Sequence, residues 1–367
     1  MREVFRAARF LKPCSSGRNK NLRESRDIIL WDEIIAIINN HQHFVITSHQ
    51  NPDGDAIGSE LGLAGHLRKL GKKVKIINHD PLPPSYRFMG RKRWVKRFSK
   101  SKHSKVIAEA EVIIVVDASG GWKRTGNVGE FCEKSTAIKV CIDHHPDTAD
   151  FADVAVIDTN AAAAAELIYD LLVTMKADFS KQMATALYTA ILTDTGNFRF
   201  PKTSPHTHEI AAKLIEYGAD PFQAYKMIYE QSTPNRVKLK GQVLANLNFA
   251  AEGQIVYFGI THAMLDACEV KTSELEGFAS LGQEIKGVRV IVYGLELGDG
   301  RVKLSLRSDD TVAVNKITAE YGGGGHHGAA GATTQGKLKT ILAEVVQKVI
   351  ALMATQLPAE TEPSRWA

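Results

Sequence analysis

The chain has 367 residues, of which 44% are hydrophobic and 24% are charged, and its formal net charge is +5. These values are ordinary for a soluble globular protein, and no run approaches the roughly 20 apolar residues that span a bilayer, which excludes an integral membrane protein. The length favours two domains, and the mild positive charge permits a polyanionic partner without requiring one.

The cysteines are scattered and form no C-x-x-C pair; they are Cys14, Cys132, Cys141 and Cys268. This pattern indicates neither a zinc knuckle nor a disulfide framework, and it fits a reducing, cytoplasmic compartment. Residues 1–27 are rich in Arg and poor in apolar residues, so we expect a basic, disordered extension outside the fold. A transit peptide or a basic amphipathic anchor is the alternative for this segment.

Regular patterns begin at Trp31, where strand-like and helix-like segments start to alternate. The predicted strands lie at 43–48, 73–78, 111–119 and 139–145. The predicted helices lie at 31–40, 55–71, 161–175 and 181–196. Alternation of this kind is typical of an α/β domain in which helices cover both faces of a mostly parallel sheet. We assign this domain to residues 28–225.

The character of the sequence changes after about Pro221. A helix is predicted at 235–247 and strands at 254–261, 288–297 and 301–308, the last two joined by a GDG hairpin signal. We therefore expect a helical linker at 226–248 and a smaller α+β domain at 249–353. Residues 354–367 have no periodicity and are predicted to form a mobile tail.

Polar residues gather directly after three predicted strands and at the end of one predicted helix. They are His49, Asp53 and Asp55; Asp117; Asp143, His144 and His145; and Asp194. Each taken alone has a simpler interpretation as a helix cap, a turn residue or a structural histidine. Because the carboxyl ends of parallel strands meet at one edge of a sheet, we expect these side chains to share one crevice.

Several carboxylates in one crevice would repel each other, and no Lys or Arg lies within these turns to neutralise them. Divalent cations remove that repulsion. Imidazole and carboxylate ligands without thiolate favour Mn²⁺, with Mg²⁺ as the alternative, and the number of groups is sufficient for two ions. A pair of such ions is suited to hydrolysis of phosphoesters.

Four segments in order, SHQNPDGDAIGS, VVDAS, IDHHP and TDTGNFRF, resemble the motifs of the DHH phosphoesterase superfamily. The segment YGGGGHHGAAGA at 321–332, preceded by VKLSLRS, resembles the glycine-rich signature of the DHH-associated C-terminal domain. The resemblance covers about residues 28–353. A chain with only these two domains is most similar to the bacterial bifunctional oligoribonucleases and pAp phosphatases, the nanoRNases, since RecJ exonucleases are longer and carry an additional OB-fold.

The resemblance also implies roles for individual residues. One metal would be held by His49, Asp53 and Asp117, and the other by Asp55, Asp117, His144 and Asp194, so that Asp117 bridges the two ions. Asp143 would orient one of the metal ligands, and His145 would face the scissile phosphate as an electrostatic stabiliser or proton donor. The run of alanines after Asn160 departs from the Ser or Thr of many relatives, and we interpret it as a plain helix N-terminus.

The second domain is expected to bind substrate. Isolated, four consecutive glycines would be read as a flexible linker. Given the resemblance, we expect Gly323, Gly324 and Gly325 to approach the nucleotide, with contacts from His326 and Arg307. The active site would then lie in the cleft between the two domains. A homodimer is a further expectation from the family.

The segment Tyr86 to Lys105 carries nine basic residues with three aromatic residues interleaved. It has two interpretations: a track for a nucleic-acid backbone, or a solvated basic helix, which we favour.

Three functions remain open from sequence. The first is a hydrolase of short single-stranded RNA, dinucleotides and pAp; the second is a cyclic-di-AMP or pApA phosphodiesterase; the third is a nucleotide- or RNA-binding protein without turnover. Intact ligand positions favour an enzyme.

Overall fold

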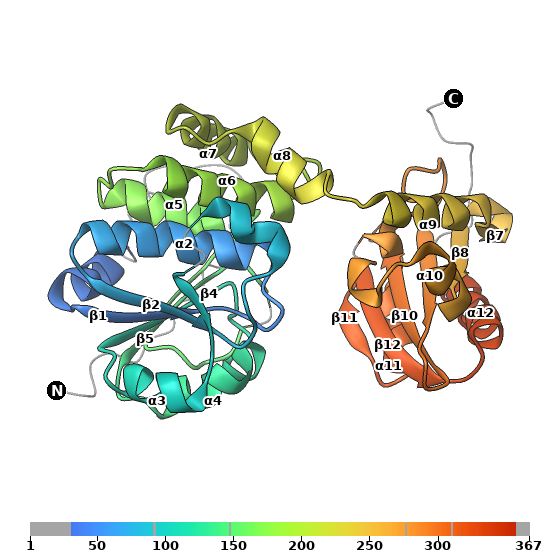
Figure 1. The fold of residues 1–367 in the computed structure, drawn as a ribbon, viewed down its shortest axis with the longest axis horizontal. Coiled ribbons are helices and arrows are strands. Elements are labelled where there is room, and N and C mark those ends of the chain that lie inside the picture. The colour runs from blue at the N-terminus through green and yellow to red at the C-terminus, as the bar shows by residue number, and fades with distance from the viewer. Residues whose placement is uncertain (1–30, 91–92, 147, 276, 310, 357–367) are drawn as a thin grey trace. The chain divides into compact units, whose positions relative to one another are not determined.

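The computed structural model describes residues 31–90, 93–146, 148–275, 277–309 and 311–356. The chain divides into two compact units on either side of the Gln231–Ser232 bond, and each unit is built on a six-stranded sheet (Figure 1). Within the described ranges, no helix is long and apolar enough to cross a membrane. The predicted N-terminal extension and Cys14 lie outside these ranges, as does most of the predicted C-terminal tail, while the three other cysteines are buried and free. The predicted domain boundaries stay predictions.

The sheet of the first unit is parallel throughout and has the strand order β3-β2-β1-β4-β5-β6. Its strands are β1 (His43–Thr47), β2 (Lys73–Asn78), β3 (Val95–Arg97), β4 (Val112–Val116), β5 (Ile138–Asp143) and β6 (Val154–Ile157). The predicted parallel α/β architecture is confirmed. The sequence analysis missed β3 and β6, because these edge strands are short and lack a long apolar run.

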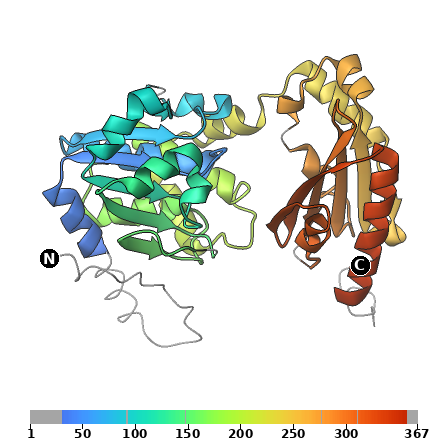
Figure 2. The same cartoon turned by 90° about the horizontal axis from the view of Figure 1, so that it is seen from below.

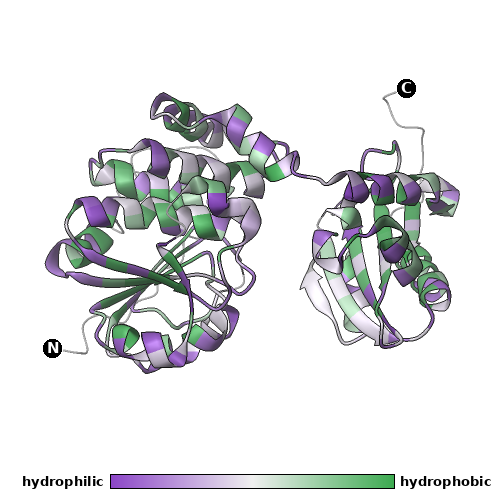
Figure 3. Cartoon of the chain, in the orientation of Figure 1, coloured by the Kyte–Doolittle hydropathy of each residue, from purple (hydrophilic) through white to green (hydrophobic). Residues whose placement is uncertain are grey.

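Helices cover both faces of this sheet, as predicted. They comprise residues 31–40, α2 (Gly54–Lys69), α3 (Lys100–Ala108), α4 (Gly129–Lys134), α5 (Ala164–Thr174), α6 (Lys181–Asp194), α7 (Pro205–Glu216) and α8 (Pro221–Tyr229). Successive residues of a strand point to opposite faces, so Phe44 and Ile46 pack toward α2, α5 and α6 while Val45 packs toward α3 and α4. Figure 3 shows the resulting concentration of apolar residues on the strands.

Close packing of α2 on α6 brings two distant parts of the sequence together. A β-carbon on Gly58 would lie 2.4 Å from the backbone oxygen of Ala186, so only glycine permits this approach. The two helices contact each other more extensively than any other pair of helices in the described chain. The first turn of α2 consequently lies beside the last turn of α6, which places Asp55 near Asp194.

The second unit has a mixed sheet of order β11-β12-β10-β9-β8-β7, in which only β8 and β9 are parallel among the described pairs. Its strands are β7 (Asn248–Ala250), β8 (Ile255–Ile260), β9 (Val290–Glu296), β10 (Arg301–Ser308), β11 (Gly324–His326) and β12 (Ala329–Gln335). Its helices are α9 (Pro234–Ala245), α10 (His262–Cys268), α11 (Val314–Ala319) and α12 (Leu338–Gln356). Helix α12 covers one face (Figure 2), and α9 and α10 cover the other. The predicted β9–β10 hairpin and the α+β class are confirmed.

The basic segment Tyr86 to Lys105 is not one helix, so the favoured interpretation was wrong. It contains part of a 3-10 helix (Pro84–Met89), strand β3 and the first turns of α3. Its aromatic residues pack inward: Phe88 and Trp94 lie against the main core, and Phe98 contacts Phe131 with ring centroids 5.0 Å apart. These rings therefore do not form a stacking surface for nucleic acid.

Candidate metal centre

All eight polar residues selected from the sequence gather at the carboxyl edge of the parallel sheet. They form three overlapping groups whose ligand atoms lie within 4.8 Å of one another: His49, Asp53 and Asp117; Asp55, His144 and Asp194; and Asp117, Asp143, His144 and His145. The first two groups each draw on helices or strands far apart in the sequence. The first two agree with the predicted ligand sets, apart from the proposed bridging of Asp117 to the second ion. The ligand roles themselves stay predictions.

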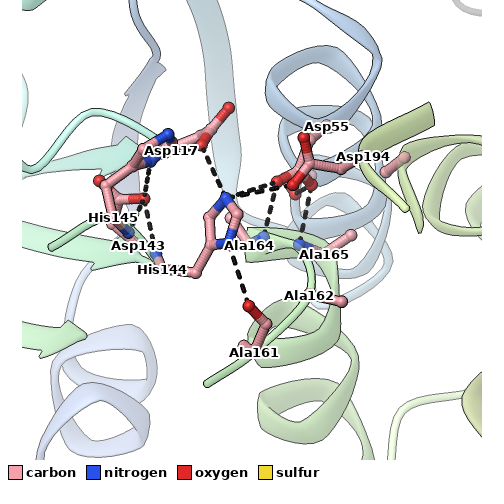
Figure 4. Close-up of polar contacts among 12 residues, drawn as sticks. Asp55, Asp117, Asp143, His144, His145, Ala161, Ala162, Ala164, Ala165 and Asp194 are labelled. Atoms are coloured by element: carbon pink, nitrogen blue, oxygen red, sulfur yellow. Dashed lines mark hydrogen bonds and ion pairs between the residues drawn. The ribbon is translucent and has the colours of Figure 1, made fainter. Parts of the chain in front are cut away.

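The imidazole of His144 lies at the middle of the centre (Figure 4). Its Nε2 lies 3.3 Å from Asp194 Oδ2, 3.6 Å from Asp117 Oδ1 and 3.7 Å from Asp55 Oδ2. These distances exceed the 2.7–2.9 Å of a charge-assisted hydrogen bond between nitrogen and carboxylate. Three carboxylates therefore surround one ring nitrogen at distances that leave room for a cation between the nitrogen and the oxygens.

The opposite ring nitrogen fixes the tautomer of His144. Nδ1 lies 3.1 Å from the backbone oxygen of Ala161, and because a carbonyl only accepts, Nδ1 carries the hydrogen. Burial and the charge of His145 lower the pKa of His144 to about 4, so the ring is neutral near pH 7. The lone pair of Nε2 then points at three carboxylate oxygens. Such an arrangement of lone pairs is unfavourable unless a proton or a metal cation lies among them.

His49 repeats the same arrangement on the other side of Asp117. Its Nδ1 donates to the backbone oxygen of Gln50 at 2.7 Å, and its Nε2 faces Asp117 Oδ2 at 3.3 Å and Asp53 Oδ1 at 3.8 Å. Burial opposes a charged ring, but interactions with Asp117 and Asp53 outweigh it and raise the pKa of His49 to about 11. Without metal this position is occupied by a proton, which a divalent cation would replace.

Three carboxylates of the centre, those of Asp55, Asp117 and Asp194, resist ionisation in the metal-free protein. Burial, aided by the charge of Asp53, raises the pKa of Asp55 to about 7. Burial and the charge of Asp55 raise the pKa of Asp194 to about 8, and the same two causes raise that of Asp117 well above its usual range. Carboxylates crowded and desolvated in this way are stabilised in their charged form by bound cations.

Asp117 is the most constrained of these residues. It is buried, it follows β4 directly, and its φ of +57° lies in the left-handed region that few residues other than glycine adopt. Its Oδ1 has no hydrogen-bond partner within the described part of the chain. A buried acceptor without a partner, held in a strained backbone conformation, fits a ligand that an absent cation would satisfy.

Asp143 organises the turn that carries the two histidines. Its Oδ1 accepts hydrogen bonds from the backbone nitrogens of His144 and His145 and from Nδ1 of His145 at 2.9 Å, while its Oδ2 accepts one from the backbone nitrogen of Ser119. Burial alone would raise its pKa, but the interactions with His145 and Ser119 hold it well below its usual range. An ionised Asp143 thus orients the ring of His145, which is not one of the expected metal ligands, and the role expected for Asp143 from sequence stays a prediction.

The alanine run after Asn160 does more than begin a helix, which the sequence analysis missed. The carboxylate of Asp55 accepts hydrogen bonds from the backbone nitrogens of Ala164 at 2.6 Å and Ala165 at 3.0 Å, at the N-terminus of α5. The carbonyl of Ala161, as described above, orients His144. These contacts use main-chain groups, so no residue type could have signalled them, although small buried residues permit such close approach.

In the second unit, strand pairing aligns the predicted substrate-binding residues. Arg307 pairs with Ala329, which pairs in turn with the backbone of His326 on β11. Arg307 is half-buried, burial lowers its pKa, and no carboxylate of a described residue forms an ion pair with it.

Close approach of β11 to β12 is a sufficient structural reason for two of the three predicted glycines. A β-carbon would lie 2.1 Å from the Gly331 oxygen if added to Gly323, and 2.5 Å from the Ala329 oxygen if added to Gly325. Of these three glycines, only Gly324 has open space where a β-carbon would lie.

Comparison with known proteins agrees with this arrangement. The DHH family, N-terminal domain, matches residues 43–191, and the DHHA1 domain matches residues 259–354. A protein of Thermus thermophilus named bifunctional oligoribonuclease and PAP phosphatase NrnA is 33% identical over 291 residues, which are 79% of this chain and 84% of that protein. The chain belongs to the DHH family.

Other relatives of this DHH protein have the same extent. The NrnA protein of Bacillus subtilis is 28% identical over 304 residues, covering 82% of this chain and 92% of the relative. The crystal structure of an exopolyphosphatase-related protein from Bacteroides fragilis is 27% identical with a TM-score of 0.85, and the match covers 89% of this chain and 97% of that one. The resemblance inferred from the four motifs is confirmed. The family of phosphoesterases is metal-dependent, and the clusters around Asp117 have the donor set for metal.

Proposed function

We propose that this DHH protein is a phosphoester hydrolase that cleaves short oligoribonucleotides, about two to five nucleotides long, to 5′-mononucleotides and removes the 3′-phosphate of pAp. The observation that carries the proposal is the lone pair of His144 Nε2 facing three carboxylates, because imidazole and carboxylate donors that converge in this way suit a divalent cation. The family, and relatives named as oligoribonuclease and PAP phosphatase, support the substrate class.

The donor set suits two divalent ions, and Asp117, which lies between the two groups, would be available to both. His49 and Asp53 would complete one site, and the other would be completed by Asp55, His144 and Asp194. Bound ions of this kind supply Lewis acidity toward phosphoryl oxygens and make a water molecule more acidic near neutral pH. Mn²⁺ suits the imidazole ligands better than Mg²⁺ and is the ion we propose.

The chain's own residues then position and protonate the substrate. Because ionised Asp143 accepts from Nδ1 of His145, we assign to Nε2 of this ring the contact with the scissile phosphate and the donation of a proton to the leaving oxygen. In the second unit, Arg307 and the backbone around Gly324 and His326 would bind the nucleotide. The predicted cleft location of the active site and the homodimer stay predictions.

The test is mononucleotide release by the full chain with Mn²⁺, offered pApA, a long RNA, pAp and cyclic di-AMP in parallel. We expect release from pApA and pAp, slow turnover of the long RNA, and loss of all activity in Asp117→Ala. Cleavage of cyclic di-AMP alone would replace the substrate with a signalling dinucleotide. Binding without cleavage, indifferent to Mn²⁺ and EDTA, would favour the non-catalytic alternative and overturn the proposal.

A further inference from the structure

The segment after Asp194 has an unusual backbone. Helix α6 ends at Asp194, and three consecutive residues, Gly196, Asn197 and Phe198, have φ values of +55°, +64° and +63°. One left-handed glycine is enough to end a helix. A phenylalanine in this region is a true outlier, because its bulky side chain is strained there. The turn therefore keeps a strained conformation that helix termination does not require.

The surrounding hydrogen bonds hold this turn in place. The backbone oxygen of Thr195 accepts from the nitrogens of Arg199 and Phe200, both at 3.0 Å. Its Oγ1 accepts from the nitrogen of Phe198 at 2.9 Å and donates to the oxygen of Ile191. The ring of the half-buried Phe198 stacks on that of the exposed His208, with ring centroids 5.3 Å apart. These hydrogen bonds tie the turn to the end of α6, and residues 199 and 200 of the turn are exposed to solvent.

It presents an aromatic ring and a cation beside the metal centre. The ring of Phe200 is 44% exposed and lies directly over Gly196, where an added β-carbon would be 2.5 Å from its Cζ. The guanidinium of Arg199 lies 5.4 Å from the centroid of that ring. Lys202, just beyond, is close enough to act on the charge of both Asp194 and His144. An exposed ring with adjacent cations has the chemistry that binds a base and its phosphate.

We infer that Arg199 and Phe200 form a nucleotide subsite of the first unit, in which a base of the substrate stacks on Phe200 and Arg199 contacts a phosphate other than the one held at the metal centre. The inference rests on the proposed function, since it places a nucleotide next to the residue that would ligate metal. Stacking is tolerant of base identity, so the subsite would give affinity for short RNA without sequence preference.

Binding measured in EDTA, where no metal-dependent cleavage takes place, tests this subsite separately from the reaction. The probes are pApA and two analogues that each lack one of its bases, bound to the full chain in EDTA. The variants are Phe200→Leu, which keeps an apolar contact with Gly196, and Arg199→Gln. The matched controls are Phe222→Leu and Lys226→Gln, because Phe222 on α8 is also exposed and Lys226 lies 5.7 Å from its ring centroid.

We expect Phe200→Leu to weaken pApA binding about tenfold. One of the two analogues lacks the base that would stack on Phe200, and the substitution should change binding of that analogue by no more than about twofold. Arg199→Gln should weaken all three probes by a similar factor, and both controls should bind as the unsubstituted protein does. Unchanged binding in Phe200→Leu, an equal loss in Phe222→Leu, or an equal loss with both analogues would overturn the subsite.

A parallel assay with Mn²⁺ separates this inference from the proposed function. If the unsubstituted protein cleaves pApA and Phe200→Leu has the same kcat/KM, the subsite is wrong and the function stands. If no substrate is cleaved, the proposed function is wrong, and the contrast between the Phe200 and Phe222 variants in EDTA still decides the subsite.

Discussion

Gly54 and Thr193 are in contact at the place where α2 begins and α6 ends, each one residue away from a candidate ligand. A β-carbon on Gly54 would lie 2.2 Å from Thr193 Oγ1 and 2.9 Å from its Cβ. Gly54→Ala should therefore push Asp55 and Asp194 apart, weaken metal binding and reduce the free energy of unfolding by about 1–3 kcal/mol. Metal titration and urea unfolding check this. Adding Thr193→Ala should restore part of both losses; no rescue would show that the contact is not the cause.

The hydrogen bonds from α5 to Asp55 predict a second effect on metal affinity. Ala164 is the first residue of α5 and follows a residue in extended conformation, a position that tolerates proline. Ala164→Pro removes the nitrogen-bound hydrogen that Asp55 accepts, and we expect metal affinity to fall about 10–100-fold. Ala164→Gly keeps that hydrogen and serves as control. Equal affinity in the two variants would contradict a positioning role for α5.

The stability of the metal-free protein should decrease between pH 6.5 and 8. In this window the folded state keeps protons on Asp55 (pKa about 7), Asp194 (about 8) and His49 (about 11), which the unfolded chain has largely lost. A folded state that binds more protons loses stability as pH rises, here by about 2–4 kcal/mol. His144, with its pKa lowered to about 4, has the opposite sign and offsets a few tenths of a kcal/mol of this decrease, because the unfolded imidazole still binds part of a proton near pH 6.5.

Urea unfolding in EDTA at both pH values measures this decrease. Mn²⁺ should abolish or reverse it, because metal binding favours the deprotonated ligands. A metal-free protein that is equally stable or more stable at pH 8 would contradict these protonation states.

His145 should affect turnover more than metal binding. Its Nδ1 contacts Asp143 at 2.9 Å, and we place its other nitrogen on the substrate. His145→Ala should lower kcat for pApA by about 10²–10⁴-fold, the usual contribution of a positioned proton donor. Affinity for Mn²⁺, measured by calorimetry, should change little. A large loss of metal affinity would instead make His145 a ligand.

Two neighbouring glycines of the second unit should respond differently to alanine. Gly325 has a φ of +142° and no space for a β-carbon, so Gly325→Ala should lower the melting temperature of the protein. Gly324 faces open space, so Gly324→Ala should leave the melting temperature unchanged while raising KM for pApA if this segment binds the nucleotide. An unchanged KM would assign the segment to strand packing alone.

Much of the centre could be predicted because its ligands follow strongly apolar strands. The buried run Val112–Val116 identifies β4 and hence places Asp117 at the carboxyl edge of the sheet. Asp194 was harder to place, since it ends a helix and reaches the centre only through the packing of α2 on α6. The inward direction of Phe88, Trp94 and Phe98 could not be predicted, because an aromatic residue among lysines has the same sequence pattern whether it faces the core or solvent.

The carbonyls of Gln50 and Ala161 set the direction in which the two histidines face the centre. Any residue placed at position 50 or 161 brings the same carbonyl oxygen, provided that the backbone keeps its course. The side chains at these two positions therefore do not decide which nitrogen of His49 or His144 carries hydrogen. The tautomers of these two rings therefore depend on the backbone conformation around residues 50 and 161. A redesign of the centre would need to keep that backbone conformation before any side chain is chosen.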